Sequence, residues 1–285
     1  MKINKIIQTD NAFPQLLRDI PQPPQEIYAL GDLTPLLSMP RLAVVGSRKV
    51  TPYGRSVTTD LIQAVARLGV VIISGLALGV DAIAHQAALD AGGRTIAVLP
   101  CGLDAPYPVR HRPLARNILT QGGALVSEYS NGTPPLQFRF LERNRLVSGL
   151  ADALLITEAT IKSGTLHTAN FALEQGKTVM AIPGNITSQL SQGTNSLIRT
   201  GAVPITSAED ILQALNINSA VLQREVLPAN AAEAAILDLI RTGTTEGSSL
   251  QTASQLDAAL FSQTLTMLEI TGKIRSLGAG HWTIN

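Results

Sequence analysis

Short apolar runs that end in glycine-containing loops recur along the first two thirds of this chain. Three of them are each followed by such a loop and then by a helical pattern: residues 42–45, 70–73 and 153–157. Further apolar runs of strand length lie at residues 95–99, 124–127 and 179–182. Strands that alternate with helices pair into mostly parallel sheets. The sequence therefore predicts an α/β fold with an extended, doubly wound, Rossmann-like sheet over residues 41–215.

The three loops carry groups that suit a phosphate ligand. A loop that ends a strand and opens a helix presents backbone N–H groups at the positive end of the helix dipole. Strand ends in a parallel sheet share one edge, so we expect the loops to line a single crevice. The residues concerned are Gly46, Ser47 and Arg48, then Ser74 and Gly75, then Lys162, Ser163, Gly164 and Thr165. A basic segment before the third run adds Arg143, Asn144 and Arg145.

Composition narrows the class of protein. Of the 285 residues, 45% are hydrophobic and 15% are charged, which is too apolar for a disordered chain. The single cysteine, Cys101, cannot form an internal disulfide or a zinc site of several thiolates. The first residues lack the apolar run of a signal peptide, and no stretch approaches the roughly 18 apolar residues of a membrane span. We therefore expect a cytoplasmic protein that does not bind to membranes.

Charge is unevenly distributed, although the net charge is only +1. Residues 41–215 contain 15 Lys and Arg against 11 Asp and Glu, whereas residues 229–285 contain three basic and five acidic residues. Any electrostatic attraction for a polyanion is therefore expected in the first domain.

The segments on either side of the α/β domain differ from it in character. Residues 1–40 are rich in proline and predict a short lead-in able to add an edge strand, and residues 216–228 lack a clear period and predict a linker. Residues 229–285 show three helical patterns and a terminal hairpin, the outline of a winged helix. Its candidate recognition helix, residues 258–271, contains Glu269 but no Lys or Arg. That composition favours a protein-contact or structural module over a reader of duplex DNA.

Several residues allow two interpretations. Asp81 and His85 stand four residues apart on a helix, so they could form an acid/base pair or could hold the preceding loop. Glu158 could be catalytic or could brace the loop that it enters. The rings of Phe138 and Phe140 could stack a nucleobase or could pack in the core. The sequence leaves these alternatives open.

A series of short motifs runs in uninterrupted order from about Phe13 to Leu215. They lie at residues 45–48, 51–54, 74–85, 102–108, 127–129, 142–145, 163–166 and 181–184. In kind and order they resemble the DNA-processing protein A (DprA/Smf) family. The resemblance implies an extended Rossmann-type domain that binds single-stranded DNA, forms a homodimer and helps to load the RecA recombinase during uptake and recombination of transforming DNA. We expect no catalytic residue, no cofactor and no metal site.

The family's binding loops carry over onto matching residues. The phosphate-gripping loop matches Gly46, Ser47 and Arg48, the basic loop matches Arg143, Asn144 and Arg145, and the later glycine loop matches Ser163, Gly164 and Thr165. Arginine forks suit phosphates. Predicted contacts beyond these loops are Ser74, Gly75, Phe140 and Lys162. The chain departs from the family at residues 138–142, where Phe-Pro commonly precedes Arg-Asn-Arg, and at residues 110–112, where Arg-His-Arg replaces a segment that usually contains Asn.

The main alternative is a nucleotide-cleaving phosphoribohydrolase of the LOG type, which has a related Rossmann core. That class carries paired glutamates after its glycine-threonine loop. Aligned on Gly164 and Thr165, the glutamates fall on His167 and Thr168, so the carboxylates needed for general acid/base chemistry are missing. A nicotinamide oxidoreductase is disfavoured because the chain lacks a Gly-x-Gly-x-x-Gly fingerprint. The sequence favours binding over catalysis.

Overall fold

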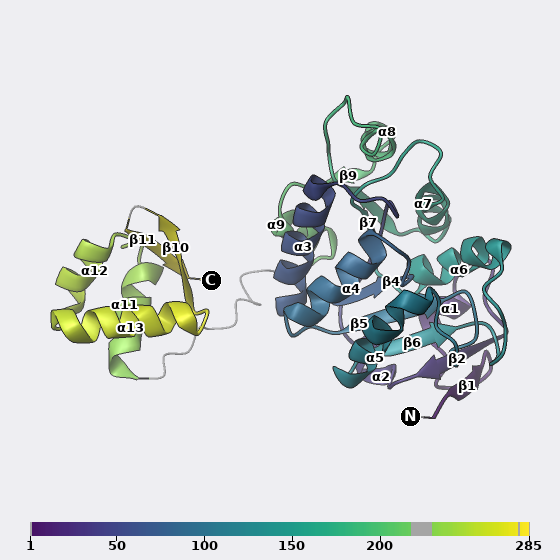
Figure 1. Ribbon diagram of the computed structural model, residues 1–285, viewed down its shortest axis with the longest axis horizontal. Helices are drawn as coiled ribbons and strands as arrows, with labels where there is room; N and C mark the ends of the chain where they lie inside the picture. The colour runs from purple at the N-terminus through teal and green to yellow at the C-terminus, as the bar shows by residue number, and fades with distance from the viewer. Residues whose placement is uncertain (1, 218–229, 279, 285) are drawn as a thin grey trace. The chain divides into compact units, whose positions relative to one another are not determined.

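The computed structural model describes residues 2–217, 230–278 and 280–284 (Figure 1). The chain divides into two compact units, Met1–Ser219 and Ala220–Asn285. The larger unit contains an extended sheet with helices on both faces, and the smaller unit has a hydrophobic core of its own.

The larger unit is built on a nine-stranded sheet with the order β1-β2-β6-β5-β4-β3-β7-β8-β9. The strands are β1 (Asn4–Ile7), β2 (Glu26–Leu30), β3 (Arg41–Val45), β4 (Val71–Ser74), β5 (Thr95–Leu99), β6 (Ala124–Ser127), β7 (Ala153–Ile156), β8 (Thr178–Ala181) and β9 (Val203–Pro204). Neighbours from β6 to β9 are parallel, whereas β2 pairs antiparallel with both β1 and β6. The chain builds outward from β3 in one direction through β4, β5 and β6, and later in the other direction through β7, β8 and β9.

Helices cover both faces of this sheet (Figure 1). One face carries α1 (Gln15–Arg18), α2 (Thr34–Leu37), α6 (Gln137–Gly149) and α7 (Thr165–Glu174). The other face carries α3 (Pro52–Arg67), α4 (Val80–Asp90), α5 (Arg112–Thr120) and α9 (Ala208–Ala214). The short helix η1 (Val109–His111) leads into α5, and α8 (Gln192–Arg199) follows the loop after β8.

Alternate residues of the central strands serve the two cores. In β3, Ala43 and Val45 pack on the side of α6 and α7, whereas Leu42 and Val44 pack on the side of α3 and α4. Because both faces are covered, these strands are mainly apolar and do not alternate between apolar and polar residues. That property makes them visible in the sequence, and the predicted α/β fold with a mostly parallel, doubly wound sheet is confirmed.

The residues before β3 contribute more than one edge strand. β2 is inserted between β1 and β6, so this segment adds two strands to the sheet. Leu17, Ile27 and Leu36 are fully buried in the same core as α6 and α7. Residues 2–40 therefore pack as part of the larger unit. The linker predicted at residues 216–228 falls mainly on residues 218–229, which lie outside the described residues.

The described part of the smaller unit consists of three helices followed by a hairpin. They are α11 (Ala231–Arg241), α12 (Gly247–Ser254), α13 (Ala258–Ile270), β10 (Ile274–Gly278) and β11 (His281–Ile284). Each of these elements places apolar side chains in one small core, which includes Ile236, Leu250 and Leu268. At its margin Lys273 pairs with the buried Glu233 at 2.5 Å. This order of elements is winged-helix-like, as the sequence predicts.

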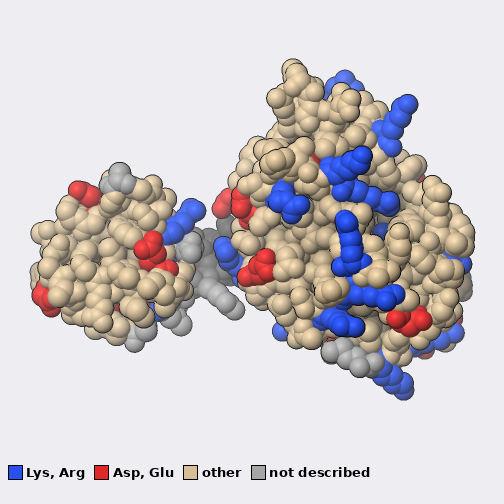
Figure 2. All heavy atoms as spheres, viewed as in Figure 1, with Lys and Arg blue, Asp and Glu red and all other residues tan. Residues whose placement is uncertain are grey.

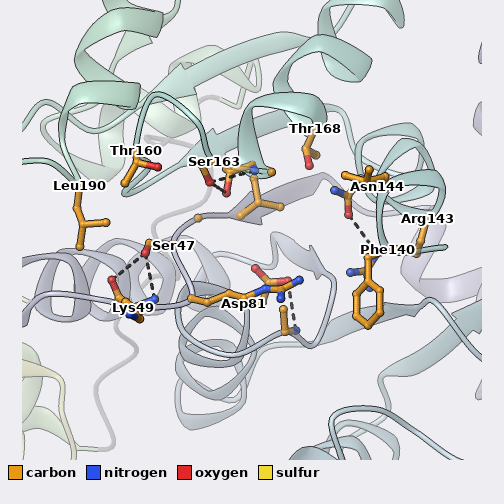
Figure 3. A pocket seen from close by; sticks show the side chains of 17 residues that line it. Ser47, Lys49, Asp81, Phe140, Arg143, Asn144, Thr160, Ser163, Thr168 and Leu190 are labelled. Atoms are coloured by element: carbon orange, nitrogen blue, oxygen red, sulfur yellow. Dashed lines mark hydrogen bonds between the residues drawn. The ribbon is translucent and has the colours of Figure 1, made fainter. Parts of the chain in front are cut away.

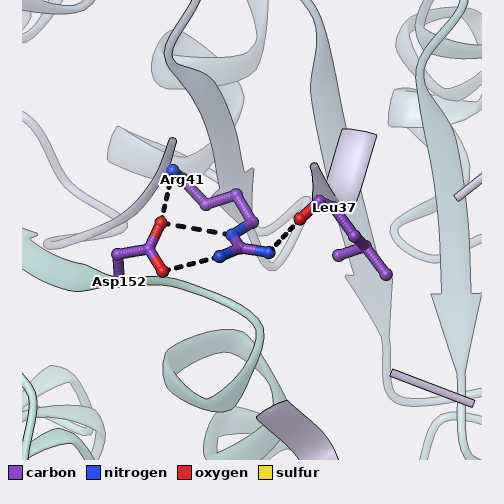
Figure 4. Close-up of polar contacts among 3 residues, drawn as sticks. All are labelled: Leu37, Arg41 and Asp152. Carbon is purple, nitrogen blue, oxygen red and sulfur yellow. Dashed lines mark hydrogen bonds and ion pairs between the residues drawn. The ribbon is translucent and has the colours of Figure 1, made fainter. Parts of the chain in front are cut away.

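An ion pair fastens the two central strands where they begin, at the edge of the sheet opposite their carboxyl ends (Figure 4). The guanidinium of Arg41 donates to both oxygens of Asp152, at 2.7 and 3.2 Å, and to the carbonyl oxygen of Leu37. The backbone N–H of Arg41 donates to the same carboxylate at 2.8 Å. Asp152 therefore holds the start of β3 against the start of β7 and connects both to the end of α2.

Candidate nucleic-acid interface

A cleft opens at the carboxyl ends of β3 and β7, where the order of the sheet reverses. Ligands of open α/β sheets bind at such a reversal because the loops on its two sides diverge. The cleft has a volume of about 470 Å³ (Figure 3). Its lining comes from the loops after β3, β4, β7 and β8, from the start of α4, from one side of α6 and from the first turns of α7: Val45, Gly46, Ser47, Arg48, Lys49, Ala77, Asp81, Phe140, Leu141, Arg143, Asn144, Thr160, Ser163, Gly164, Thr165, Thr168 and Leu190.

The loop after β3 is held in a fixed shape by its own serine. The hydroxyl of Ser47 donates to the carbonyl of Lys49 at 2.7 Å and accepts from the Lys49 N–H at 3.0 Å. The loop also packs tightly on Gly79, which has a φ of +83°, and a Cβ there would lie 2.2 Å from the Ser47 carbonyl oxygen. Only glycine satisfies both conditions. The result is a rigid turn that leaves the side chains of Arg48 and Lys49 exposed.

Arg48 lies next to an aromatic pair. Its guanidinium carbon is 5.6 Å from the centre of the Phe140 ring, within the range of a cation–π interaction. The ring of Tyr107 meets the same ring edge-on, with centres 5.8 Å apart. Phe140 is only partly buried and lines the cleft (Figure 3), whereas the ring of Phe138 is 53% exposed. A cation beside an open ring suits a nucleotide, because phosphate and base can be contacted together.

The opposite wall of the cleft is the first turn of α7. Ser163 donates its hydroxyl to Thr165 at 2.9 Å and accepts the Thr165 N–H at 3.1 Å. Gly164 has nothing within 4 Å of the position of a Cβ, so the backbone is open to the cleft there. The helix has no acidic residue in its first turn to compete for the positive end of its dipole. Lys162 is exposed on the same loop and lies outside the residues that line the cleft.

The floor of the cleft is a buried polar network around Arg143. This side chain is only 4% exposed and donates to the carbonyls of Gly75, at 2.7 Å, and of Val98. Asp81 accepts the backbone N–H groups of Gly75 and Ala77, at 3.0 and 3.3 Å. Burial lowers the pKa of Arg143 to about 10 and raises the pKa of Asp81. Arg143 therefore holds the strand ends together and adds positive charge from beneath the cleft.

Two further predicted contacts belong to this interior. Ser74 is fully buried and donates its hydroxyl to the carbonyl of Val44 at 2.6 Å. A Cβ on Gly75 would lie 2.5 Å from the guanidinium of Arg143, so a side chain there would displace the guanidinium from its present position. The structure thus brings Gly46, Ser47, Arg48, Phe140, Arg143, Asn144, Ser163, Gly164 and Thr165 to one cleft and places Ser74 and Gly75 behind it.

Arg145 lies outside the lining of the cleft. Its guanidinium pairs with Glu128 at 2.6 Å, its side chain is 11% exposed, and its carbonyl accepts from the side chain of Gln175. These contacts connect α6 with the end of β6 and with the end of α7. Two arginines two residues apart on a helix point in different directions, so they do not both face the cleft, and the sequence does not say which one does.

Asp81 and His85 have separate hydrogen-bond partners. Thr95 gives its only hydroxyl proton to the carbonyl of Ile72 at 2.6 Å, so it must accept from Nδ1 of His85, which lies 2.6 Å away. His85 is fully buried, and burial lowers its pKa to about 3, so it is a neutral core residue. Asp81 has different partners, the loop N–H groups. The two side chains therefore hold separate parts of the fold.

Glu158 braces the loop after β3. Its carboxylate accepts from the N–H and the hydroxyl of Thr51, at 3.0 and 2.5 Å, and is 2% exposed. Thr51 in turn caps α3 by accepting the N–H of Gly54 at 3.0 Å. The lining residues that were not predicted as DNA contacts are Val45, Lys49, Ala77, Asp81, Leu141, Thr160, Thr168 and Leu190. Of these, Lys49 could have been found from its position directly after Arg48.

Basic side chains gather on the face of the larger unit that carries α4 and α5. Figure 2 shows Lys and Arg in a band across this face with few acidic side chains among them. In the described part of the chain, His, Cys, Asp and Glu do not form groups of three or more that could hold a metal ion. Among the same residues, no helix combines the length and the apolar character needed to cross a bilayer.

Comparison with known proteins identifies the larger unit. Residues 4–216 match the family model of DNA recombination-mediator protein A. The chain belongs to this family. Protein Smf of Escherichia coli is 45% identical to this family member over 212 residues, which cover 74% of this chain and 56% of that protein. The chain thus spans little more than half the length of that relative, and 49% of the length of the putative DprA of Mycobacterium tuberculosis.

Solved structures of DNA processing protein A share the fold of this recombination-mediator family member. The protein from Streptococcus pneumoniae matches with a TM-score of 0.70 and 40% identity, over 75% of this chain and 74% of that one. The protein from Helicobacter pylori, described for its unique mode of single-stranded DNA binding, matches with a TM-score of 0.68 and 35% identity, over 76% of this chain and 96% of that one.

Proposed function

We propose that this chain binds single-stranded DNA in the cleft at the carboxyl ends of β3 and β7. The observation that carries the proposal is the combination of an exposed arginine over an open aromatic ring with the first turn of α7 on the opposite wall. The arginine and the helix end suit a phosphate, and the ring suits a base. The family relationship, and the DNA-binding relative from Helicobacter pylori, support the same ligand.

Within this proposal the predicted contacts have different roles. Arg48 and the backbone of the loops at Gly46, Ser47 and residues 163–165 contact phosphates, and Phe140 stacks a base. Lys162 adds a cation at the rim. Arg143, Ser74 and Gly75 act from the interior, because their polar groups are already committed to strand ends. Contacts of this kind read charge and shape rather than base edges, so binding has no strong sequence preference.

The biological role that follows is recombination mediation. The bound chain helps to load RecA onto single strands during uptake and recombination of transforming DNA, acts in the cytoplasm and forms a homodimer. Its membership of the recombination-mediator family supports this role. RecA assembly on a single strand, measured with and without the full-length chain, tests the loading step, and size-exclusion chromatography tests the dimer.

Catalysis is not part of the proposal. Asp81 is the carboxylate among the residues that line the cleft, and it already accepts two backbone N–H groups. His167 lies outside the lining of the cleft, and Thr168, which lies in it, has only a hydroxyl, so neither takes the place of the paired glutamates. We expect no release of free base when the protein is incubated with AMP. Base release that is lost in Glu158→Ala would support the phosphoribohydrolase alternative.

A binding titration over a series of salt concentrations tests the main proposal. The full-length chain is titrated onto single-stranded and duplex oligonucleotides of equal length, with fluorescence anisotropy as the readout. We expect preference for the single strand and an affinity that falls steeply as salt rises, since phosphate contacts release counterions. Equal affinity for the duplex, or an affinity independent of salt, would overturn the proposal.

A further inference from the structure

A second pocket lies beside the cleft, on the far side of the same loops. It has a volume of about 600 Å³ and is lined by Thr51, Pro52, Tyr53, Glu158, Pro183, Gly184, Asn185, Ser188 and Ser191. Three loops contribute neighbouring residues to both sites. The loop after β3 gives Lys49 to the cleft and Thr51 to the pocket, the loop after β7 gives Thr160 and Glu158, and the loop after β8 gives Leu190 and Ser191. The two sites therefore share three loops.

The chemistry of this pocket is opposite to that of the cleft. No Lys, Arg or His lies among its lining residues, and its one charged group is the buried carboxylate of Glu158, which is engaged with Thr51. A phosphate would be repelled by that carboxylate and would find no cation. The pocket therefore fits a neutral part of a ligand.

The walls suit a flat ring. Tyr53 is 49% exposed, and its hydroxyl donates to the carbonyl of Pro183 at 2.9 Å, which fixes the ring across the pocket. Pro52 and Pro183 line the same pocket. Asn185 uses its side-chain oxygen to accept from the N–H and hydroxyl of Thr187, so its amide N–H groups remain to donate. Together, the side chains of Tyr53 and Asn185 can bind a flat ring that has polar edges.

We infer that this pocket takes a nucleobase of the same single strand whose phosphates lie in the cleft. This inference rests on the proposed function. The strand crosses the loop at Lys49, its backbone stays on the basic side, and one base turns into the neutral pocket and stacks on Tyr53. The site adds affinity for any base, because every base has a face to stack and the pocket is wide.

Tyr53 variants test this inference with two ligands, a single-stranded oligonucleotide and an abasic strand of equal length. We expect Tyr53→Ala to weaken binding of the base-bearing strand by about tenfold, as loss of one stacking contact does, and to leave binding of the abasic strand within about twofold. Tyr53→Phe keeps the ring and should bind almost as the wild type does. Ile186→Ala is the matched control, because Ile186 is 85% exposed on the same β8 loop and does not line the pocket.

The outcomes separate the two proposals. If the wild type binds single strands and Tyr53→Ala binds them equally well, the inference is overturned while the proposed function stands. The same conclusion follows if the wild type binds AMP, Tyr53→Ala does not bind AMP, and the two proteins have equal affinity for the single strand. The pocket would then bind a free nucleotide. If the wild type binds no single strand, both proposals fail. A tenfold loss for the base-bearing strand alone supports both.

Discussion

Three arginines near the cleft have three different environments, and these decide what each contributes. Arg48 is exposed over Phe140, Arg143 is buried beneath the cleft, and Arg145 is paired with Glu128 outside it. An exposed cation can bind a phosphate without breaking other contacts. A buried or paired cation would first have to lose its hydrogen bonds or its ion pair. Their effects on DNA binding and on stability should therefore separate.

Arg48→Ala is expected to weaken binding of single-stranded DNA by roughly 10- to 100-fold. A charge-assisted contact to phosphate contributes about 1.5–3 kcal/mol, and this side chain makes no buried contact whose loss would disturb the fold. Titration by anisotropy measures the affinity, and urea unfolding shows whether stability is preserved. Wild-type affinity in this variant would remove Arg48 from the interface.

Arg145→Ala provides the contrast. Loss of the pair with Glu128 should lower the free energy of unfolding by about 1–3 kcal/mol, because the pair is largely screened from water. Affinity for the single strand should change far less than in Arg48→Ala. The opposite pattern, with stability intact and affinity lost, would place Arg145 on the DNA after all.

His85 should make the larger unit sensitive to mild acid. The folded state keeps this histidine neutral down to a pKa of about 3, whereas the unfolded chain takes up a proton near pH 6.5. The unfolded state therefore binds more protons between these values, and stability falls as the pH falls through that window. From pH 7 to pH 5 the loss due to His85 is about 2 kcal/mol.

His85→Gln tests this sensitivity, because it removes the titrating group and retains hydrogen-bonding capacity toward Thr95. Urea unfolding at pH 7 and pH 5 should show a smaller difference in this variant than in the wild type. Asp81, whose pKa is raised by burial, acts in the opposite direction but is present in both proteins. Equal pH dependence of the two proteins would show that His85 does not titrate on unfolding.

At the level of elements, an ion pair stabilises the pairing of β3 with β7 at one end, and the cleft lies at the other end. Asp152→Ala removes the carboxylate that holds Arg41 and the start of β3. We expect the free energy of unfolding to fall by about 1–3 kcal/mol, as loss of hydrogen bonds to a charged group does. Single-strand affinity should be unchanged, since the pair lies at the edge of the sheet opposite the cleft. A parallel loss of affinity would mean that the two edges are coupled.

The central strands can be predicted because the sequence pattern that marks each of them lies within a few consecutive residues. Strands buried on both faces, such as β5 and β7, appear as unbroken apolar runs, and each is followed by a loop with glycine or proline. β1 and β9 were not recognised, since a four-residue strand with polar positions and a two-residue strand leave no period to detect.

The cleft was predictable in part for the same reason. Loops at the carboxyl ends of parallel strands must meet, so Arg48 and Gly164 could be placed together from the sequence. The depth at which a side chain lies depends on tertiary packing instead. Nothing in the run Arg143-Asn144-Arg145 indicates that the first arginine is buried or that the second is paired with Glu128.

At the scale of the whole molecule, the smaller unit should add little to DNA affinity. Removing residues 229–285 is expected to change single-strand affinity by less than about threefold, under about 0.7 kcal/mol. The segment has a net charge of −2, α13 offers no cation to a phosphate, and Lys273 is paired with Glu233. Titration of the truncated chain under the conditions used for the full-length chain measures the difference.

The wing of the smaller unit gives the sharpest test of that expectation. Arg275 is exposed on β10 and can be changed to Glu without breaking the buried pair of Lys273. Binding equal to that of the wild type would agree with the truncation. A tenfold loss in Arg275→Glu and in the truncated chain would show that this wing holds DNA.

The pairing of β3 with β7 also sets the moment at which a growing chain can become active. Leu42 pairs with Ala153, so the two walls of the cleft are encoded more than a hundred residues apart. During synthesis the edge of β3 that pairs with β7 keeps its backbone N–H and C=O groups unpaired until β7 leaves the ribosome. Until then a nascent chain offers Arg48 but no opposite wall, and it exposes an edge that other nascent strands can join. The same topology that places the site at the centre of the sheet therefore delays its function until most of the larger unit has been made.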